Sequence, residues 1–342
     1  MICIDAGAVQ RSSELVRAVE RRWERRAAPN LLPAARCPGG QAFVREACRR
    51  GEGTKIYRPG WTGLGLVEGR LVAGFDVNCS ILFTELPLVQ RPAAARAAGF
   101  TAVEFWWPWS MAVPSDGQVD ALVRAVRDAG VSLVGLNFFA GDMAAGDRGL
   151  VSWPARSAEL RDNVDVVVGI GQQLGCRAFN ALYGNRAPEV ALQLQDEVAV
   201  ENLALAAAAA ARVDGVVLVE PVSGAPAYPL RTAADAVGVI DRVERAAGLS
   251  NLRLLSDLYH LAVNGDDPQQ AIARYVERIG HVQIADAPGR HEPGTGQLPI
   301  EAYLSQLAET GYAGWVGLEY QPSGASADSF TWLPLDQRRI SI

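Results

Sequence analysis

Short apolar runs alternate with longer amphipathic segments from residue 71 onward. Runs of four to eight apolar residues predict buried strands, and longer segments with apolar positions three and four apart predict helices. The predicted strands are 71–80, 102–106, 132–137, 177–182, 215–220, 252–257, 282–285 and 316–319. The predicted helices are 86–98, 118–129, 156–174, 188–212, 232–247, 268–278 and 300–310. Six glycines follow helices at positions suited to a left-handed cap: Gly99, Gly130, Gly175, Gly248, Gly280 and Gly311.

Strands that alternate with helices form either a closed parallel barrel or a doubly wound sheet. The later strands carry polar residues that decide between the two. Glu220 ends LVE, Asp257 ends LLSD, Gln283 lies within HVQIAD, and Glu319 ends WVGLE. In a barrel, such side chains from successive strands meet at one mouth, whereas a doubly wound sheet gathers its site at one switch point. We therefore predict an α/β fold, a (β/α)8 TIM barrel.

Three carboxylates and one carboxamide are oxygen ligands. They suit one hard divalent cation, Mg²⁺ or Mn²⁺, better than zinc, which prefers His and Cys. For Glu220 alone, a salt bridge at the barrel rim is an equally good interpretation. Four such residues in register favour the metal site, because isolated buried carboxylates are costly.

Three further residues lie near this mouth in the predicted barrel. His260, three residues after Asp257, is either a donor beside the metal and substrate or a satisfied rim histidine. Arg290 lies in the loop ADAPGRHEPGTG and can clamp a substrate carboxylate, or it can be solvated. Glu104 lies within the predicted strand 102–106 and faces the same mouth as a candidate substrate contact. The Gly-rich loop 139–154, which carries Arg148, is a candidate lid.

The chain has 342 residues, 49% of them hydrophobic and 20% charged, which is typical of a globular protein. Residues 1–70 differ from the rest, because they are rich in Gly, Pro and Arg and hold 13 basic and 7 acidic residues. We predict an N-terminal extension over 1–70, disordered or loosely packed, followed by the barrel domain over 71–342. Binding of RNA or an acidic partner by the Arg cluster, and an over-extended reading frame, are the alternatives for the extension.

Composition excludes several kinds of chemistry. The one lysine, Lys55, lies outside the barrel region, so no barrel strand offers an amine for a Schiff base. Three histidines are too few for a His-rich multi-zinc site. The whole chain has a net charge of −6 and residues 1–70 are +6, so residues 71–342 carry −12, which argues against a nucleic-acid surface. We expect no membrane span and no secretory signal, and five scattered cysteines without a CxxC pair favour a reduced, cytoplasmic protein.

Several segments over about residues 74–321 together resemble the hydroxypyruvate isomerase family of xylose isomerase-like barrels. The matching pieces are NCSILFTELPLVQRPAAARAAGFTAVEFWWPW, LNFFAGDMAAGDRGL, LVEP, SDLYH, HVQIADAPGRHEPGTGQL and GYAGWVGLEY. The resemblance implies that Glu220, Asp257, Gln283 and Glu319 hold one divalent metal and that Glu220 and Glu319 are the acid and base. It also implies that His260 and Arg290 touch a small hydroxy-oxo acid substrate. Residues 1–70 have no counterpart in it.

The expected activity is the interconversion of hydroxypyruvate and tartronate semialdehyde through an enediolate. Moving a carbonyl by one carbon needs a base, an acid and stabilised negative charge, but no redox cofactor. A 2-oxo-tetronate isomerase and a ketose 3-epimerase are the near alternatives, although epimerases usually place a His where Gln283 stands. A barrel phosphodiesterase and a non-catalytic metal-binding protein are weaker alternatives. The sequence leaves open the metal's identity and the oligomeric state, a homo-oligomer included.

Overall fold

The computed structural model describes residues 64–67 and 70–338. The chain divides into two compact units, Met1–Thr62 and Gly63–Ile342. The first unit lies outside the described residues. The predicted extension over 1–70 therefore falls almost wholly outside them, and its disorder or loose packing stays a prediction.

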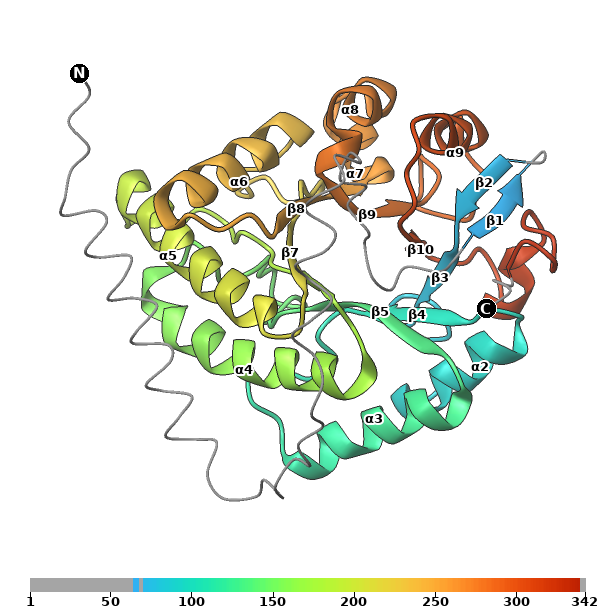
Figure 1. Ribbon diagram of the computed structural model, residues 1–342, viewed down its shortest axis with the longest axis horizontal. Helices are drawn as coiled ribbons and strands as arrows, with labels where there is room; N and C mark the ends of the chain where they lie inside the picture. The colour runs from blue at the N-terminus through green and yellow to red at the C-terminus, as the bar shows by residue number, and fades with distance from the viewer. Residues whose placement is uncertain (1–63, 68–69, 339–342) are drawn as a thin grey trace, which may run out of the picture. The chain divides into compact units, whose positions relative to one another are not determined.

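Eight parallel strands close into a barrel in the order β10-β3-β4-β5-β6-β7-β8-β9, and Figure 1 shows helices arranged around them. The strands are β3 (Phe75–Asn78), β4 (Ala102–Phe105), β5 (Ser132–Asn137), β6 (Ala178–Asn180), β7 (Val216–Val219), β8 (Leu252–Asp257), β9 (Ile279–Ile284) and β10 (Val316–Leu318). The closed order confirms the predicted (β/α)8 barrel and rules out the doubly wound sheet.

The prediction of one continuous first strand over 71–80 is wrong. Strand β2 (Arg70–Ala73) pairs antiparallel with β1 (Leu64–Val67) in a separate two-stranded sheet. Only β3 enters the barrel, where it pairs with β10 and β4. The run of apolar residues does not reveal this division, because both halves are extended.

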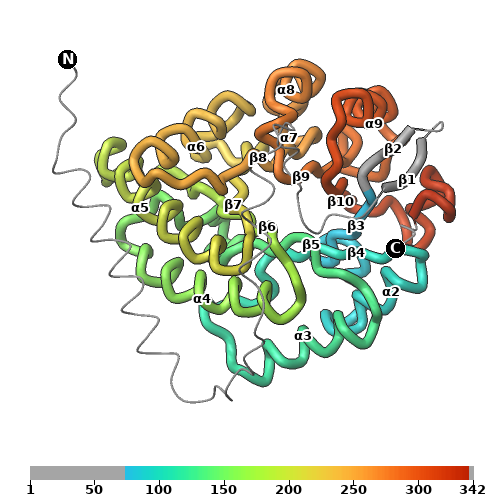
Figure 2. The backbone as a smooth tube through the Cα atoms, viewed as in Figure 1, coloured from blue at the N-terminus to red at the C-terminus, as the bar shows by residue number. Residues whose placement is uncertain are grey.

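Helices follow the strands around the barrel, as the tube in Figure 2 traces. They are α2 (Arg91–Ala97), α3 (Asp116–Ala129), α4 (Ser157–Leu174), α5 (Leu192–Ala211), α6 (Ala233–Ala247), α7 (Leu258–Asn264), α8 (Pro268–Tyr275) and α9 (Ile300–Glu309), with short 3-10 turns η2 (Leu88–Gln90), η3 (Pro154–Arg156), η4 (Val276–Arg278) and η5 (Ser326–Phe330). The seven predicted helices are confirmed within a few residues at their ends. Helix α7 was not predicted.

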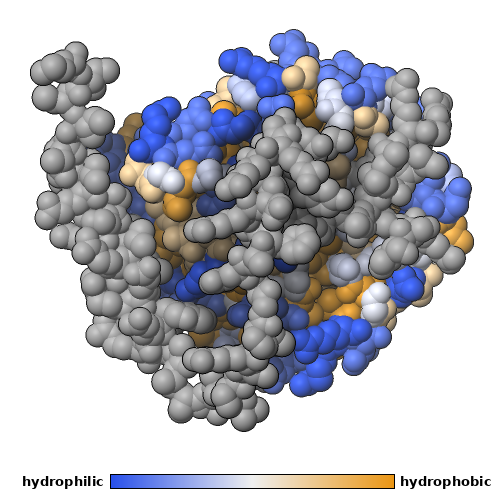
Figure 3. Space-filling model, viewed as in Figure 1, coloured by the Kyte–Doolittle hydropathy of each residue, from blue (hydrophilic) through white to orange (hydrophobic). Residues whose placement is uncertain are grey.

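Local signals explain where the helices begin and end. Helix α6 begins at a capping box formed by Thr232 and Asp235 and ends at Gly248 with φ 68°. Glycine tolerates this left-handed conformation at no steric cost, so a glycine there stops the helix. In Figure 3 the outward side of α3 at the lower edge and of α6 and α8 at the upper edge is largely hydrophilic.

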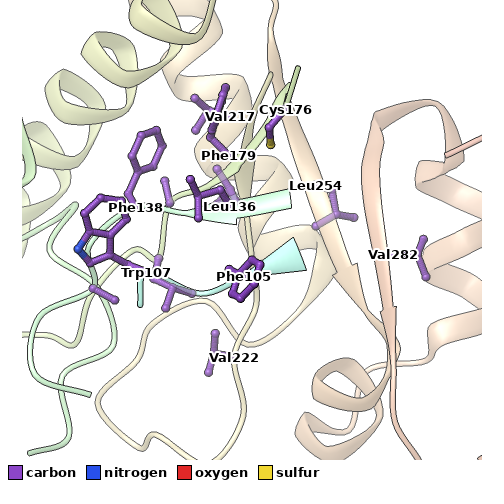
Figure 4. Close-up of a cluster of buried hydrophobic side chains, with 14 of the residues drawn as sticks. Phe105, Trp107, Leu136, Phe138, Cys176, Phe179, Val217, Val222, Leu254 and Val282 are labelled. Carbon is purple, nitrogen blue, oxygen red and sulfur yellow. The ribbon is translucent and has the colours of Figure 1, made fainter. Parts of the chain in front are cut away.

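The core lies between the outer side of the strands and the inner side of the helices. Figure 4 shows Phe179 on β6 near Val217 on β7, with Phe138 close by. The rings of Phe138 and Phe179 have centroids 6.0 Å apart. Small residues let the helices approach, because a Cβ at Gly171 on α4 would lie 2.5 Å from Cζ of Phe179. The alanine run on α5 also packs closely, since residues such as Ala207 are fully buried.

The inner side of the strands forms two layers, since side chains of a strand alternate with period two. The deeper layer contains Asp76, Ala178, Leu218, Leu255, His281 and Gly317. Two residues further along the same strands, the upper layer contains Asn78, Asn180, Glu220, Asp257, Gln283 and Glu319. The upper layer holds all four residues predicted as metal ligands.

Gly280 sets the register of this upper layer on β9. Leu254 pairs with Ile279 but Leu255 pairs with His281, so Gly280 is an extra, bulged residue. The prediction that Gly280 caps a helix is wrong. It has no side chain because a Cβ there would lie 2.6 Å from Cβ of Arg253 and 2.7 Å from Cδ2 of Leu218.

Gly280→Ala should destabilise the barrel by about 1–3 kcal/mol, because a methyl group is forced into a packed interior. The matched control is Gly238→Ala on α6, where a Cβ meets nothing within 4 Å. The control should stabilise the protein by about 0.5–1 kcal/mol through helix propensity. Urea unfolding of both variants measures the difference, and equal effects of the two substitutions would contradict the bulge.

Candidate active site

Carboxylates from three strand ends converge at the mouth of the barrel. One ligand atom each from Glu220, Asp257, Glu319 and His260 lies within 4.8 Å of all the others, and all four residues are buried. Gln283 is adjacent, because its Nε2 donates to Oε1 of Glu319 at 3.2 Å. The structure therefore brings together the four residues predicted as ligands.

Gln283 offers a free oxygen to this group. Its Nε2 is held by Glu104 at 2.8 Å as well as by Glu319, whereas its buried Oε1 has no hydrogen-bond partner among the described residues. An unpartnered buried amide oxygen is costly unless something binds it. Three carboxylates and this oxygen make a donor set that fits a hard divalent cation.

Asp257 uses its two oxygens differently. Oδ1 accepts from the backbone N–H groups of Tyr259 and His260 and so caps the N-terminus of α7. Oδ2 faces the site, 3.5 Å from Nε2 of His260 and 3.5 Å from Nη2 of Arg290. One carboxylate thus both starts a helix and leaves a single oxygen for a ligand.

Helix α7 positions His260 over the site. Nδ1 of His260 accepts the backbone N–H of Ser223 at 3.1 Å and lies 2.7 Å from Oγ of Ser223. In the neutral ring the proton then sits on Nε2, which points toward Asp257 and Glu220. Burial lowers the pKa of His260 to about 4, so the ring is neutral near pH 7 and Nε2–H is a donor.

Glu220 follows β7 and is held by a neighbour on the next strand. Nδ2 of Asn180 on β6 donates to Oε2 of Glu220 at 2.7 Å. Burial, together with the negative charge of Asp257, raises the pKa of Glu220 to about 8. Its backbone is fixed too, because the hydroxyl of Tyr228 donates to the carbonyl of Glu220 at 2.9 Å.

Glu319 follows β10 and is surrounded by donors. Nε1 of Trp106 donates to its Oε1 at 2.5 Å and Nδ2 of Asn78 at 2.8 Å, while Oε2 pairs with Nη2 of Arg290. Burial raises the pKa of Glu319 well above its usual range, although the charge of Arg290 opposes this. The guanidinium of Arg290 also stacks over the Tyr259 ring at 5.3 Å.

The loop that carries Arg290 is organised by Asp286. Its carboxylate accepts the backbone N–H groups of Ala287, Gly294, Gly296 and Leu298 at 2.8–2.9 Å. Burial would raise the pKa of Asp286, but these four donors outweigh it and lower the pKa. The loop ADAPGRHEPGTG is thus an ordered structure around the Asp286 carboxylate rather than a solvated loop.

Glu104 lies beneath the pocket rather than in its wall. Its Oε1 accepts from Asn78 at 3.0 Å and from Gln283 at 2.8 Å, and its Oε2 lies 2.8 Å from Nε2 of His281. Glu104 is not among the residues that line the pocket above the carboxylates. Its contacts indicate that it positions Gln283, and the substrate contact predicted from sequence stays a prediction.

Asp76 lies deepest in this network and is fully buried. Neither of its carboxylate oxygens has a hydrogen-bond partner among the described residues, and the nearest cationic group, Nε2 of His281, is 3.9 Å away. Burial, and then the charge of Glu104, raises the pKa of Asp76 well above its usual range. Burial alone would lower the pKa of His281, but the charge and hydrogen bond of Glu104 raise it.

A pocket of about 500 Å³ opens above the carboxylates. Glu220, Glu319, His260, Arg290, Trp106 and Arg148 are among its lining residues. A second pocket of about 410 Å³, walled by Trp107 and Trp109, shares Trp106, Asn137 and Met143 with the first. The cavity therefore has room for a small molecule and an extension along the tryptophans.

Several residues of the site were not singled out by sequence reasoning. They are Asn180, which holds Glu220, Ser223, which fixes the tautomer of His260, and Asp76 below the site. Helix α7 had a usable signal, since Asp257 precedes it at the N-cap and Gly265, with φ 84°, ends it. Asn180 and Ser223 had none, because their partners are remote in sequence.

Comparisons with known proteins agree with the fold. Residues 92–334 match the family described as xylose isomerase-like TIM barrel. A putative hydroxypyruvate isomerase of Streptomyces coelicolor is 55% identical over 77% of this chain and 96% of its own length. The hydroxypyruvate isomerase of Escherichia coli is 31% identical over 76% and 97%, and a 2-oxo-tetronate isomerase of Cupriavidus necator is 34% identical over 76% and 96%.

Among solved structures, the crystal structure of an AP endonuclease, family 2, from Brucella melitensis is similar with a TM-score of 0.69. It is 34% identical, and the match covers 76% of this chain and 97% of that one. Within the part of the chain that the structure describes, no helix is long and apolar enough to cross a membrane.

Asp76→Asn should stabilise the protein, and by more as the pH rises. The pKa of Asp76 is higher in the folded state than the ordinary value near 3.8, so the folded state keeps a proton that the unfolded state releases. Stability is then lost with rising pH, by about 1.4 kcal/mol for each pH unit between the two pKa values. Because asparagine does not titrate, the variant should not lose stability in this way as the pH rises.

Urea unfolding of parent and variant at pH 5 and pH 8 measures the effect. Asp120→Asn on the exposed face of α3 controls for the change in net charge. A gain in stability that is the same at both pH values would contradict a protonated Asp76.

Proposed function

The chain belongs to the hydroxypyruvate isomerase family of xylose isomerase-like TIM barrels, and from this premise we propose that it interconverts hydroxypyruvate and tartronate semialdehyde in a metal-dependent reaction. As a member of that family it is an isomerase. The carbonyl moves by one carbon through an enediolate: a proton leaves one carbon and arrives at its neighbour, and the hydroxyl proton passes to the oxygen of the former carbonyl. Atoms and electrons balance within the substrate, so no redox cofactor takes part.

The observation that supports this proposal is the convergence of three buried carboxylates and one unpartnered amide oxygen. Glu220, Asp257, Glu319 and Oε1 of Gln283 would hold one Mg²⁺ or Mn²⁺. When bound, such a cation supplies a Lewis acid that offsets negative charge on the substrate oxygens. Asn180, Asn78 and Trp106 fix the carboxylate orientations that this donor set requires.

Glu220 and Glu319 are the proposed base and acid. A carboxylate takes the proton from the carbon that carries the hydroxyl, and a carboxyl group returns a proton to the carbon that carried the carbonyl. Both side chains end strands on the wall of one pocket, so each can reach a three-carbon substrate held between them. In the reverse direction their roles exchange.

His260 and Arg290 are proposed to contact the substrate. Nε2–H of the neutral His260 can donate to a substrate oxygen without bringing a second cation into the site. Arg290 lines the same pocket while its Nη2 stays on Glu319 and near Asp257. It therefore orients two carboxylates of the site as well.

A 2-oxo-tetronate isomerase is the second candidate. The relative from C. necator carries this name, and the adjoining pocket of about 410 Å³ offers room for a fourth carbon. A screen of three- and four-carbon hydroxy-oxo acids and simple ketoses by proton NMR, with and without Mn²⁺, separates these activities. Turnover of neutral ketoses alone would identify an epimerase or sugar isomerase and overturn the proposal.

Removal of the metal should abolish activity. Dialysis against EDTA is expected to lower turnover of hydroxypyruvate about 100-fold or more, since several kcal/mol of charge stabilisation is lost. Adding Mn²⁺ or Mg²⁺ should restore turnover, and Ca²⁺ serves as a control for general divalent stabilisation. Full activity of the metal-free protein, with metal content checked by mass spectrometry, would refute metal dependence.

Glu220→Gln and Glu319→Gln should each lower kcat by about 10²–10⁴-fold, because an amide cannot exchange the proton. The fold should be kept, as circular dichroism can show, since glutamine has the same shape. Glu301→Gln, on the exposed side of α9, is the control and should keep full activity. Retained turnover in both site variants would end the proposed acid–base roles.

A further inference from the structure

We infer that Arg148 binds the carboxylate of the substrate and gives the pocket its preference for small hydroxy-oxo acids over neutral sugars. The inference rests on the proposed function in taking the pocket above Glu220 and Glu319 as the substrate site. Arg148 is half-buried, lies in the loop after β5, and lines that pocket together with His260. Sequence reasoning had placed it in a lid.

One edge of the Arg148 guanidinium is fixed and the other is free. Nη1 donates to the carbonyl of Met143 at 3.0 Å and to that of Asp147 at 2.7 Å. Nε and Nη2 make no hydrogen bond to any residue that the structure describes. An Nε–Nη2 edge is the fork that grips both oxygens of a carboxylate.

An arginine just after this loop shows the same grip in use. Arg156 donates from Nε and Nη2 to the two oxygens of Glu159, each at 2.8 Å. Arg156 also pairs with Asp147 at 2.7 Å, so the acidic side chain next to Arg148 in sequence is already occupied. No carboxylate of the described residues forms an ion pair with Arg148, in contrast to Arg290.

Charge complementarity points to an anion at Arg148. As ligands of the proposed divalent cation, Glu220, Asp257 and Glu319 would be carboxylates, and the cation and Arg290 together would balance their three negative charges. Among the ionisable side chains that line the pocket, Arg148 is then the positive charge without a counterpart. A monocarboxylic substrate brings one negative charge, whereas a neutral ketose leaves Arg148 unpaired.

Arg148 is also held on a rigid support, which a binding residue needs. The next residue, Gly149, donates its N–H to the carbonyl of Ala140 at 2.9 Å and bridges to Tyr183. Gly149 has φ 108°, and a Cβ there would lie 2.0 Å from the carbonyl oxygen of Leu182. The backbone therefore packs directly on the segment after β6.

The test measures binding of D-glycerate, which has the carboxylate but no carbonyl and so is not turned over. Titration calorimetry with Mn²⁺-loaded protein compares the parent, Arg148→Gln, Arg148→Lys and the control Arg127→Gln. Arg127 donates to the carbonyl of Gln173 at 2.9 Å on the surface. Arg148→Gln should raise the Kd about 10- to 100-fold, because a charged bidentate contact is lost. The Kd of Arg148→Lys should lie between those of the parent and of Arg148→Gln, since lysine keeps the positive charge but not the bidentate geometry.

Kinetics supply the second readout. For hydroxypyruvate, Arg148→Gln should raise KM by a similar factor with a smaller change in kcat, because the contact is made in the ground state as well. The inference is overturned if the Kd of Arg148→Gln for D-glycerate stays within twofold of the parent while circular dichroism shows a folded protein. Arg148-dependent binding of D-glycerate without turnover of hydroxypyruvate would support the subsite and refute the proposed reaction instead.

Discussion

Crowding of buried negative charge at the barrel mouth is the constraint to which the rest of the site responds. Glu220, Asp257 and Glu319 present oxygens within 4.8 Å of one another, away from solvent. Two like charges about 4 Å apart repel by about 4 kcal/mol at an effective dielectric constant near 20. Such a group persists only where donors and cations surround it.

The neighbouring strands supply these partners. Asn78, Trp106 and Asn180 donate to the carboxylates, and Arg290 bridges two of them. Each partner comes from a different βα unit, so closing the barrel and assembling the site are one event. This explains why a fold with a packed interior tolerates so many ionisable groups at one end of its strands.

The register of β9 links packing to chemistry. A bulge at Gly280 adds one residue, and without it His281 and Gln283 would turn from the interior to the helix side. Glu104 then holds Gln283 by its amide nitrogen, and the amide oxygen has no hydrogen-bond partner among the described residues. Gly280, which permits close packing, thus sets the register that places the side chain of Gln283 in the upper layer.

The sequence by itself determined the barrel, the helices except α7, and the identities of the four candidate ligands, because hydrophobic periodicity and polar strand ends are local properties. It misassigned Gly280 and did not reveal that Glu104 holds Gln283, since both roles depend on what lies opposite in the barrel. Only the tertiary structure decided that Asn180 holds Glu220 and that Arg148 has a free edge. Hydrogen bonds between strands far apart in the chain leave no periodic trace, so three-dimensional closure alone reveals them.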